Sequence, residues 1–142
     1  MQEHNKQAAL RYLNVRMRSE HEMRQYLIKR SVADDEIEEI ITYLYSYHYL
    51  DDVEFAASFI RDRCRFHPCG RVKLTHDLRE KGIDTFVIED VLAEVFPPEL
   101  EEMQLHREYE RCKQKGKSYQ QSMRYLYGKG YSADALADLT RY

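Results

Sequence analysis

The chain has few prolines and no long hydrophobic run. No proline precedes Pro68, and the only others are Pro97 and Pro98, so long helices with few breaks are expected. The longest uncharged run, residues 40–50 (IITYLYSYHYL), is far shorter than the ~20 apolar residues of a membrane-spanning helix. The N-terminal residues MQEHNKQAALRYLNVR lack the apolar core of a signal peptide. These absences favour a cytoplasmic protein without a membrane partner.

Cysteine is also scarce. Cys64, Cys69 and Cys112 are odd in number and irregularly spaced, which fits neither a disulfide framework nor a zinc ribbon, and suits a reducing compartment. Cys64, His67 and Cys69 could be considered as metal ligands, but CRFHPC has no second half of a zinc motif, so a loop is favoured. An enzyme that uses His67, Cys69 and His76 is a further alternative, although their spacing matches no known catalytic requirement. We therefore expect no catalytic residue, metal or cofactor, and no small-molecule substrate.

Apolar residues recur at helical spacing, and the same pattern returns later in the chain. Two segments, ADDEIEEIITYL and DTFVIEDVLAEV, carry apolar residues at positions i, i+3, i+4 and i+7, which is typical of amphipathic helices. These residues are Ile37, Ile40, Ile41 and Leu44 in the first segment and Ile88, Val91, Leu92 and Val95 in the second, at an offset of 51 residues. A further offset of 48 matches KGIDTFVIEDVL, which begins at residue 81, with KGYSADALADL, which begins at residue 129. The sequence therefore predicts three copies of one unit.

Each copy has a matching helix start. Ser19 with Glu22, and Ser118 with Gln121, have the spacing of a capping box, in which the two side chains bond to each other's backbone N–H groups. Gly70 holds the equivalent place in the middle copy and is tolerated as an N-cap. The second helix of each copy is therefore expected to begin just after these three positions.

The turn that follows this helix is also repeated. Gly82 and Gly130 lie where a helix ends in a left-handed residue, and Ser31 holds that place in the first copy. A helix before this pair is matched between the first two copies at an offset of 47 rather than 51. The four extra residues are expected in the loop CRFHPCG, residues 64–70.

These observations predict an all-α fold of three tandem three-helix repeats. The expected units are residues 4–49, 50–97 and 98–142, the last ending about two turns into its final helix. Its first helix, in ELEEMQLHREYERCKQK, is a poorer version of the pattern. Units this small cannot bury enough apolar surface alone, so an elongated, curved row of packed units is expected.

Charge is segregated along the chain despite a net charge of −3. Residues 1–30 carry seven Lys or Arg against three Asp or Glu, and residues 31–60 carry none against eight. Residues 61–82 carry seven against three, residues 83–110 one against nine, and residues 111–142 seven against two. Each unit is basic early and acidic late, which predicts one positive and one negative surface for complementary partners. The alternative is that these runs are ordinary solvated helix faces.

The candidate partner-binding residues belong to the basic surface, mostly at the end of the first helix and the start of the second in each unit. They are Arg16, Arg18, Arg24, Arg61, Arg63, Arg65, Arg71, Lys73, Arg79 and Lys81. Four tyrosines, Tyr43, Tyr45, Tyr47 and Tyr49, could stack on exposed bases. Alternate positions spread around a helix, so packing at the junction between units is the favoured role for them.

Several segments together resemble a known family. YLDDVEFAASFIRDR, Gly70, LTHDLREKGI and the earlier RSEHEMRQYL are similar to the RecX family of bacterial regulatory proteins, over nearly the whole chain. The resemblance implies tandem three-helix repeats and a partner, the RecA recombinase filament on single-stranded DNA. It implies a regulator that lies in the filament groove and restrains ATP hydrolysis, filament growth and strand exchange. A monomer is expected, and weak direct contact with single-stranded DNA is left open.

The resemblance also suggests roles for individual residues. Arg63 either pairs with a carboxylate inside the fold or faces the filament. The family pattern implies a cap at Asp51, turns at Gly70 and Gly82, and core positions at Leu50, Phe55, Ala56, Leu74, Leu78 and Ile83.

A helix-turn-helix DNA-binding protein that acts without recombinase is the main alternative. Its recognition helix would present DDEIEE and VIEDVLAEV to phosphates, whereas phosphate contacts need Lys and Arg. The recombinase regulator is therefore the favoured hypothesis.

Overall fold

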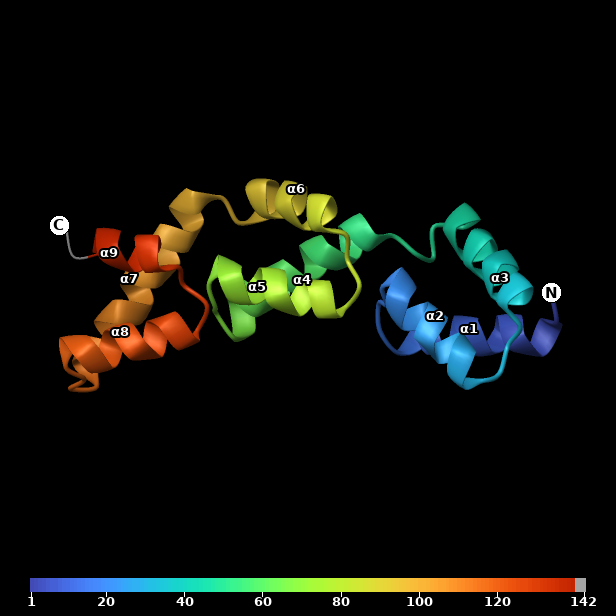
Figure 1. The fold of residues 1–142 in the computed structure, drawn as a ribbon, viewed down its shortest axis with the longest axis horizontal. Coiled ribbons are helices and arrows are strands. Elements are labelled where there is room, and N and C mark those ends of the chain that lie inside the picture. Colours follow the sequence, from blue (N-terminus) through green and yellow to red (C-terminus); the bar gives the residue numbers. More distant parts are fainter. Residues whose placement is uncertain (140–142) are drawn as a thin grey trace.

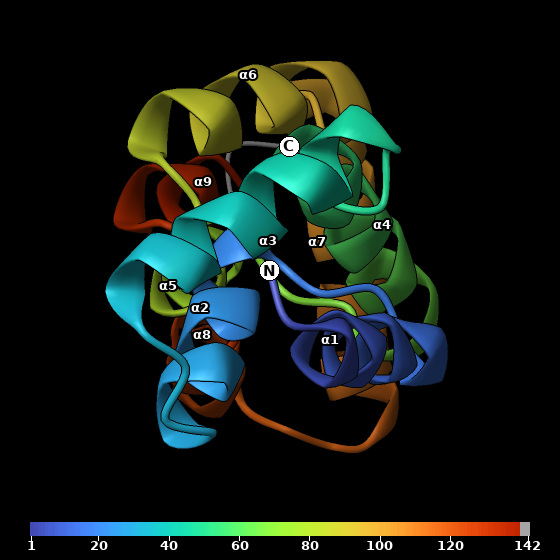
Figure 2. The ribbon, with the colours of Figure 1, turned by 90° about the vertical axis from the view of Figure 1, so that its right-hand side faces the viewer.

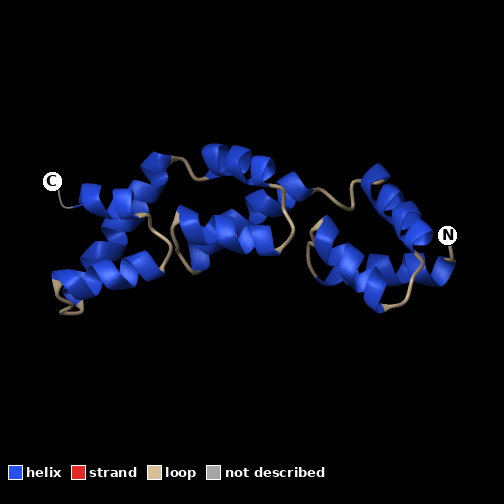
Figure 3. Cartoon of the chain, in the orientation of Figure 1, coloured by secondary structure: helices blue, strands red, loops and turns tan. Residues whose placement is uncertain are grey.

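The computed structural model describes residues 1–139, which form nine α-helices and contain no strand (Figures 1 and 3). The predicted all-α fold with three tandem three-helix repeats is confirmed. The first unit contains α1 (Glu3–Val15), α2 (Glu20–Lys29) and α3 (Asp34–Ser46). The second contains α4 (Asp52–Phe66), α5 (Arg71–Glu80) and α6 (Thr85–Val95), and the third contains α7 (Pro98–Gln114), α8 (Tyr119–Gly128) and α9 (Ala133–Leu139).

Each unit has a hydrophobic core of its own. The four apolar residues predicted to share one face of α3 are buried in the first core. Ile88, Val91 and Leu92 of α6 are buried in the second. The third core is the smallest and contains Leu126 and Tyr131. The core positions that the family pattern implied are all buried, at 5% exposure or less. Leu50 packs in the core of the first unit, although the sequence assigned it to the second. The unit boundaries at residues 49, 50, 97 and 98 stay predictions.

The units follow one another along the long axis of an extended molecule (Figure 1). Seen along that axis, the second helices α2, α5 and α8 lie on one side, and the first helices α1, α4 and α7 lie on the other (Figure 2). The units are therefore stacked with little rotation between them. No helix within residues 1–139 is both long enough and apolar enough to cross a membrane.

The predicted caps and turns are confirmed. Ser19 and Ser118 each form a complete capping box, and Gly70 is the N-cap of α5. Gly82 and Gly130 have φ angles of 80° and 93°, in the left-handed region that favours glycine. Ser31 has a φ of 62° at the equivalent place, and Asp51 caps α4 by accepting a bond from the Glu54 N–H.

The four extra residues of the second unit lie in a helix, which corrects the expectation of a longer loop. At an offset of 47, Val15 at the end of α1 corresponds to residue 62, but α4 continues to Phe66. Residues 67–70 then join α4 to α5, just as residues 16–19 join α1 to α2. Four residues make about one helical turn, so the insertion lengthens the helix and leaves the loop unchanged.

Candidate protein-interaction surface

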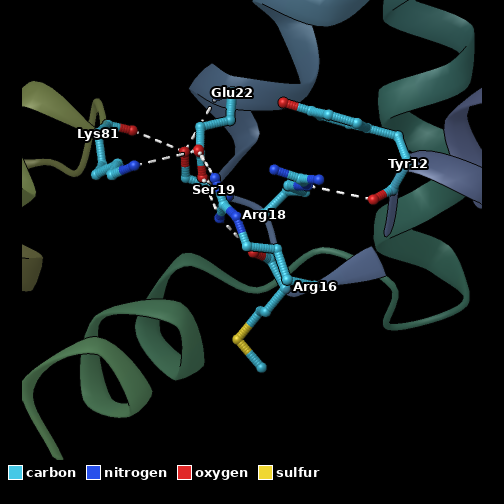
Figure 4. Close-up of polar contacts among 7 residues, drawn as sticks. Tyr12, Arg16, Arg18, Ser19, Glu22 and Lys81 are labelled. Carbon is cyan, nitrogen blue, oxygen red and sulfur yellow. Dashed lines mark hydrogen bonds and ion pairs between the residues drawn. The ribbon is translucent and has the colours of Figure 1, made fainter. Parts of the chain in front are cut away.

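The first two units meet at the start of α2. The Ser19 hydroxyl donates a hydrogen bond to the Lys81 carbonyl oxygen at 2.7 Å, so the turn after α5 rests on the N-terminus of α2. Lys81 Nζ lies 3.4 Å from Glu22 Oε2, and Arg16 Nη2 lies 2.6 Å from the same oxygen (Figure 4). Two of the candidate basic residues are thus brought together around one carboxylate, at the joint between units.

Arg18 makes contacts inside the first unit and is largely buried. Only 9% of this residue is exposed, and its Nε donates to the Tyr12 carbonyl oxygen at 3.2 Å. The guanidinium carbon lies 3.7 Å from the centre of the Tyr12 ring, a cation–π contact (Figure 4). These contacts hold α1 close to the start of α2 and leave little of the cation for a partner.

The second and third units meet in the same way. The Gly70 N–H donates to the Lys129 carbonyl oxygen at 2.8 Å, and the Val72 N–H donates to the Gly130 carbonyl oxygen at 3.0 Å. Helix N-termini have unpaired N–H groups, and here the next unit's turn supplies their acceptors. The second helices α8, α5 and α2 therefore form one row, joined end to end.

Arg63 pairs with a carboxylate inside the fold, which is the first of the two roles that the sequence left open. Its Nη1 lies 2.7 Å from Asp77 Oδ2, and Lys73 Nζ lies 3.8 Å from the same oxygen. The guanidinium also lies 4.7 Å from the centre of the Phe59 ring. Arg63 belongs to the extra turn of α4, so this turn ties α4 to α5.

Arg24 and Arg71 are also engaged. Arg24 bonds to Glu20 at 2.8 Å and to Glu38 at 2.6 Å, which links α2 to α3. Arg71 Nη2 donates to the Phe96 carbonyl oxygen at 3.1 Å, which links α5 to the end of α6. Both guanidinium groups therefore hold helices of the same unit together.

Besides Arg16, whose side chain is 46% exposed but bonds to Glu22, four of the ten candidates are exposed. Arg61 pairs with Glu54 at 3.1 Å, but both side chains are more than half exposed, and such surface pairs contribute little. Arg65 and Arg79 are exposed and make no ion pair with any residue of the described chain. The fourth is Lys73, whose side chain is 44% exposed.

Tyr47 and Tyr49 follow the end of α3 and are exposed, so the favoured packing role is wrong for these two of the four tyrosines. Tyr47 is 60% exposed and Tyr49 is 49% exposed, with their ring centres 6.0 Å apart. Tyr43 packs partly against the first core, and the Tyr45 hydroxyl donates to Glu20 at 2.7 Å. The sequence placed all four tyrosines on one helix, whereas α3 ends at Ser46 and the last two lie beyond it.

The cysteines lie in apolar surroundings. Burial raises the pKa of the Cys64 thiol to about 11, and burial likewise raises the pKa of Cys69 although Arg63 opposes the shift. Both thiols are therefore protonated at neutral pH, which is unfavourable for a nucleophile. Within residues 1–139, no three His, Cys, Asp or Glu side chains are placed to hold a metal ion.

The Glu22 carboxylate at the first joint predicts a pH-dependent stability. Burial opposes its ionisation, but hydrogen bonds from Arg16 and Ser19 and the charge of Lys81 outweigh it and hold the pKa below 4.5. A carboxylate with a lowered folded-state pKa stabilises the fold above its unfolded pKa, and this contribution is lost as pH falls. The variant Glu22→Gln should lose about 1–2 kcal/mol near neutral pH.

Urea unfolding of both proteins, followed by circular dichroism, measures this difference. It should shrink steadily once the pH falls below 4.5, because Glu22 then becomes neutral in the original protein as well. A difference of the same size at about pH 7 and about pH 3 would contradict an ionic role for Glu22.

The architecture and surface together define a class of protein. Three small helical units in a row, with several exposed cations and an extended surface, are typical of tandem-repeat proteins that bind other macromolecules. The match to family models is consistent with this class: residues 6–44 match the first three-helix domain of RecX, and residues 51–92 match the second. The chain belongs to the RecX family of regulatory proteins.

Two individual relatives and one solved structure agree with this family assignment. The chain is 36% identical over 134 residues to the regulatory protein RecX of Bacillus licheniformis, covering 91% of this chain and 51% of that protein. It is 38% identical over 86 residues to that of Prosthecochloris aestuarii, covering 61% of this chain and 57% of that protein. The crystal structure of RecX from Lactobacillus salivarius superimposes with a TM-score of 0.84 at 26% identity, covering 95% and 91% of the two chains. The chain spans only about half the length of the curated relatives it matches.

Proposed function

We propose that this protein binds the RecA recombinase filament on single-stranded DNA and restrains its ATP hydrolysis, growth and strand exchange. The family supplies the partner, and one observation supports the mode of binding. The units are joined end to end in an extended row (Figure 1), and the exposed candidate cations lie on α4 and α5 of the middle unit. A rod of this kind can contact successive protomers of a helical filament at once.

The proposed contacts are four exposed candidates that make either no ion pair with a described residue or only a weak one, namely Arg61, Arg65, Lys73 and Arg79. The other six candidates engage groups of the fold itself, and replacing them would disturb a joint or a unit. Arg63→Glu together with Arg71→Glu is therefore a poor test, because Arg63 pairs with Asp77 and Arg71 bonds to the Phe96 carbonyl. Exposed interface charges mainly change the rate of association and its dependence on salt.

The proposed function is tested by the DNA-dependent ATP hydrolysis of the recombinase from the same organism, with this protein titrated from well below to above the recombinase concentration. Inhibition at substoichiometric amounts would favour action at filament ends or on assembly. Inhibition only near equal concentrations would favour coating of the groove. The absence of both inhibition and filament binding would contradict the proposal.

The variant Lys73→Gln with Arg79→Glu tests the contacts on α5. We expect about a five- to tenfold higher concentration for half-inhibition, equivalent to about 1–1.4 kcal/mol, with an unchanged circular dichroism spectrum. The matched control is Glu89→Lys with Asp90→Lys on α6, two exposed carboxylates whose replacement should weaken inhibition much less. Because the control changes the net charge in the opposite direction, an equally large gain of inhibition by the control would mean that net charge, and not this surface, determines binding.

A further inference from the structure

A groove lies where α4 of the second unit approaches the start of α7 in the third. Its volume is about 340 Å³, within the range of small ligand sites. A cavity of about 150 Å³ already holds a benzene ring, so this groove has room for one or two large side chains. Its lining includes Arg61, Arg65, Val95, Leu100, Met103 and Arg107.

The extra helical turn of α4 forms one wall of the groove. Cys64 and Arg65 line it, and both follow residue 62, where the first helix of the first unit would have ended. The insertion of one turn therefore creates a surface that the first unit does not have. It also places Arg65 beside the apolar residues at the end of α6.

The floor of the groove is apolar and accessible. Leu100 is 46% exposed and Met103 is 58% exposed, next to the half-buried Val95. Methionine is common on surfaces that bind peptides, because its flexible, polarizable side chain adapts to different apolar partners. An apolar side chain that enters this groove would remove these groups from water.

The rim of the groove is cationic. Three arginines line it and no carboxylate does. Arg65 and Arg107 are exposed and form no ion pair with another described residue, so their charges are available to an anionic partner. Arg61 lies on the rim with its exposed partner Glu54. The groove therefore complements a ligand that is apolar at its centre and negatively charged at its edges.

A buried amide adds a hydrogen-bond acceptor. Gln104 lines the groove and is 9% exposed, and its Nε2 donates at 2.8 Å both to the Cys69 carbonyl oxygen and to the Tyr131 hydroxyl. These bonds fix the orientation of the amide, so its oxygen remains to accept a bond. A peptide backbone N–H is a suitable donor for it.

The same features disfavour nucleic acid. Single-stranded DNA binds by stacking bases on exposed aromatic rings, and the one aromatic residue in the lining, Phe96, is 2% exposed. An apolar floor without an accessible ring is better matched to aliphatic or aromatic side chains of a protein.

We propose that this groove binds an acidic peptide segment that carries one or two large apolar side chains. The apolar side chains lie over Leu100 and Met103, and carboxylates on either side pair with Arg65 and Arg107. The proposal rests on the proposed function in one respect, since the recombinase is the partner expected to present such a segment. The binding itself needs no recombinase and can be measured separately.

The test uses fluorescence anisotropy with a short labelled peptide of alternating glutamate and leucine. We expect saturable binding by the original protein, and about tenfold weaker binding by Arg65→Glu with Arg107→Glu. The control variant Arg111→Glu with Arg124→Glu makes the same change in charge at exposed residues outside the groove, and should bind nearly as well as the original protein. A second variant, Met103→Glu, tests the apolar floor and should also weaken binding.

Two further peptides test the need for apolar side chains and for negative charge separately. A peptide of glutamate and serine lacks the apolar side chains, a peptide of lysine and leucine lacks the negative charge, and both should bind poorly. Equal binding of the glutamate–serine peptide, or equal loss in the groove and control variants, would overturn the proposal. Oligothymidine that binds the groove more tightly than the acidic peptide would overturn it in favour of nucleic acid. Peptide binding without inhibition of the recombinase would support the groove as a peptide site and contradict the proposed function. Inhibition of the recombinase without peptide binding would support the proposed function and contradict the assignment of the groove.

Discussion

Replacing Gly130 by alanine is expected to separate the third unit from the second. Gly130 has a φ of 93°, and a methyl group there would overlap Cβ and the backbone nitrogen of Lys73. The left-handed conformation costs about 1–2 kcal/mol for a residue with Cβ. Overlap with packed atoms adds about 1–3 kcal/mol, for a total of about 2–5 kcal/mol.

The overlap falls on the joint itself. The Gly130 carbonyl accepts the Val72 N–H, and the Lys129 carbonyl accepts the Gly70 N–H, so the two units approach through their backbones. A backbone cannot yield as the end of a long side chain can. The overlap is therefore relieved at the lowest cost in free energy when the third unit moves away and both bonds between the units are lost.

Gly116→Ala is the matched control. Gly116 also has a positive φ, 80°, but a methyl group there would meet nothing within 4 Å. This variant should show only the conformational cost of about 1–2 kcal/mol and keep the original shape. Thermal unfolding compares the stabilities, and small-angle X-ray scattering should report a larger radius of gyration for Gly130→Ala alone. Identical behaviour of the two variants would mean that the joint does not depend on close approach at Gly130.

The sequence predicted the repeated parts of the fold because they depend on local rules. Apolar spacing gave the helices, and the capping boxes and glycine turns gave their ends. The longer α4 was missed because proline and glycine in CRFHPCG favour a loop, while α4 continues through Cys64 to Phe66 before the proline. The length of the helix depends on packing of the extra turn, including the bond between Arg63 and Asp77.

The candidate basic surface could be predicted only as a set of charges. Sequence does not distinguish Arg18, which lies over the Tyr12 ring, from Arg79, which is exposed. The difference arises from contacts between helices and, for Lys81, from a carboxylate 59 residues away in another unit. A joint between units was expected, but its position at the starts of α2 and α5 follows only from the three-dimensional arrangement.

The weaker pattern of the third unit's first helix has a structural explanation. The buried face of α7 includes Gln104 and Glu108 beside Leu105 and Cys112, so its apolar stripe is interrupted. Gln104 occupies this face because its amide bonds to two buried groups from other parts of the chain, Cys69 and Tyr131. A polar residue within a buried helical stripe was therefore the signal of a connection between units.

Gln104→Leu is expected to have the second large effect. It removes both 2.8 Å bonds and leaves the Cys69 carbonyl and the Tyr131 hydroxyl without this partner, where both residues are 1% exposed. Each buried polar group without a partner costs about 1–3 kcal/mol, so we expect a loss of about 2–4 kcal/mol in the free energy of unfolding. Gln114→Leu, at an exposed position of the same helix, is the control and should change stability by less than about 0.5 kcal/mol.

A double-mutant cycle with Tyr131→Phe shows whether this connection causes the loss. Tyr131→Phe removes the hydroxyl and should cost about 1 kcal/mol, whereas the double variant should cost less than the sum because no hydroxyl then remains unpaired. Strictly additive losses in urea unfolding would exclude the bond as the cause. Tyr131 does not line the groove between α4 and α7, whereas Gln104 does. Tyr131→Phe should therefore keep the affinity for the acidic peptide while it lowers stability, which separates the amide's role in joining the units from its role in the groove.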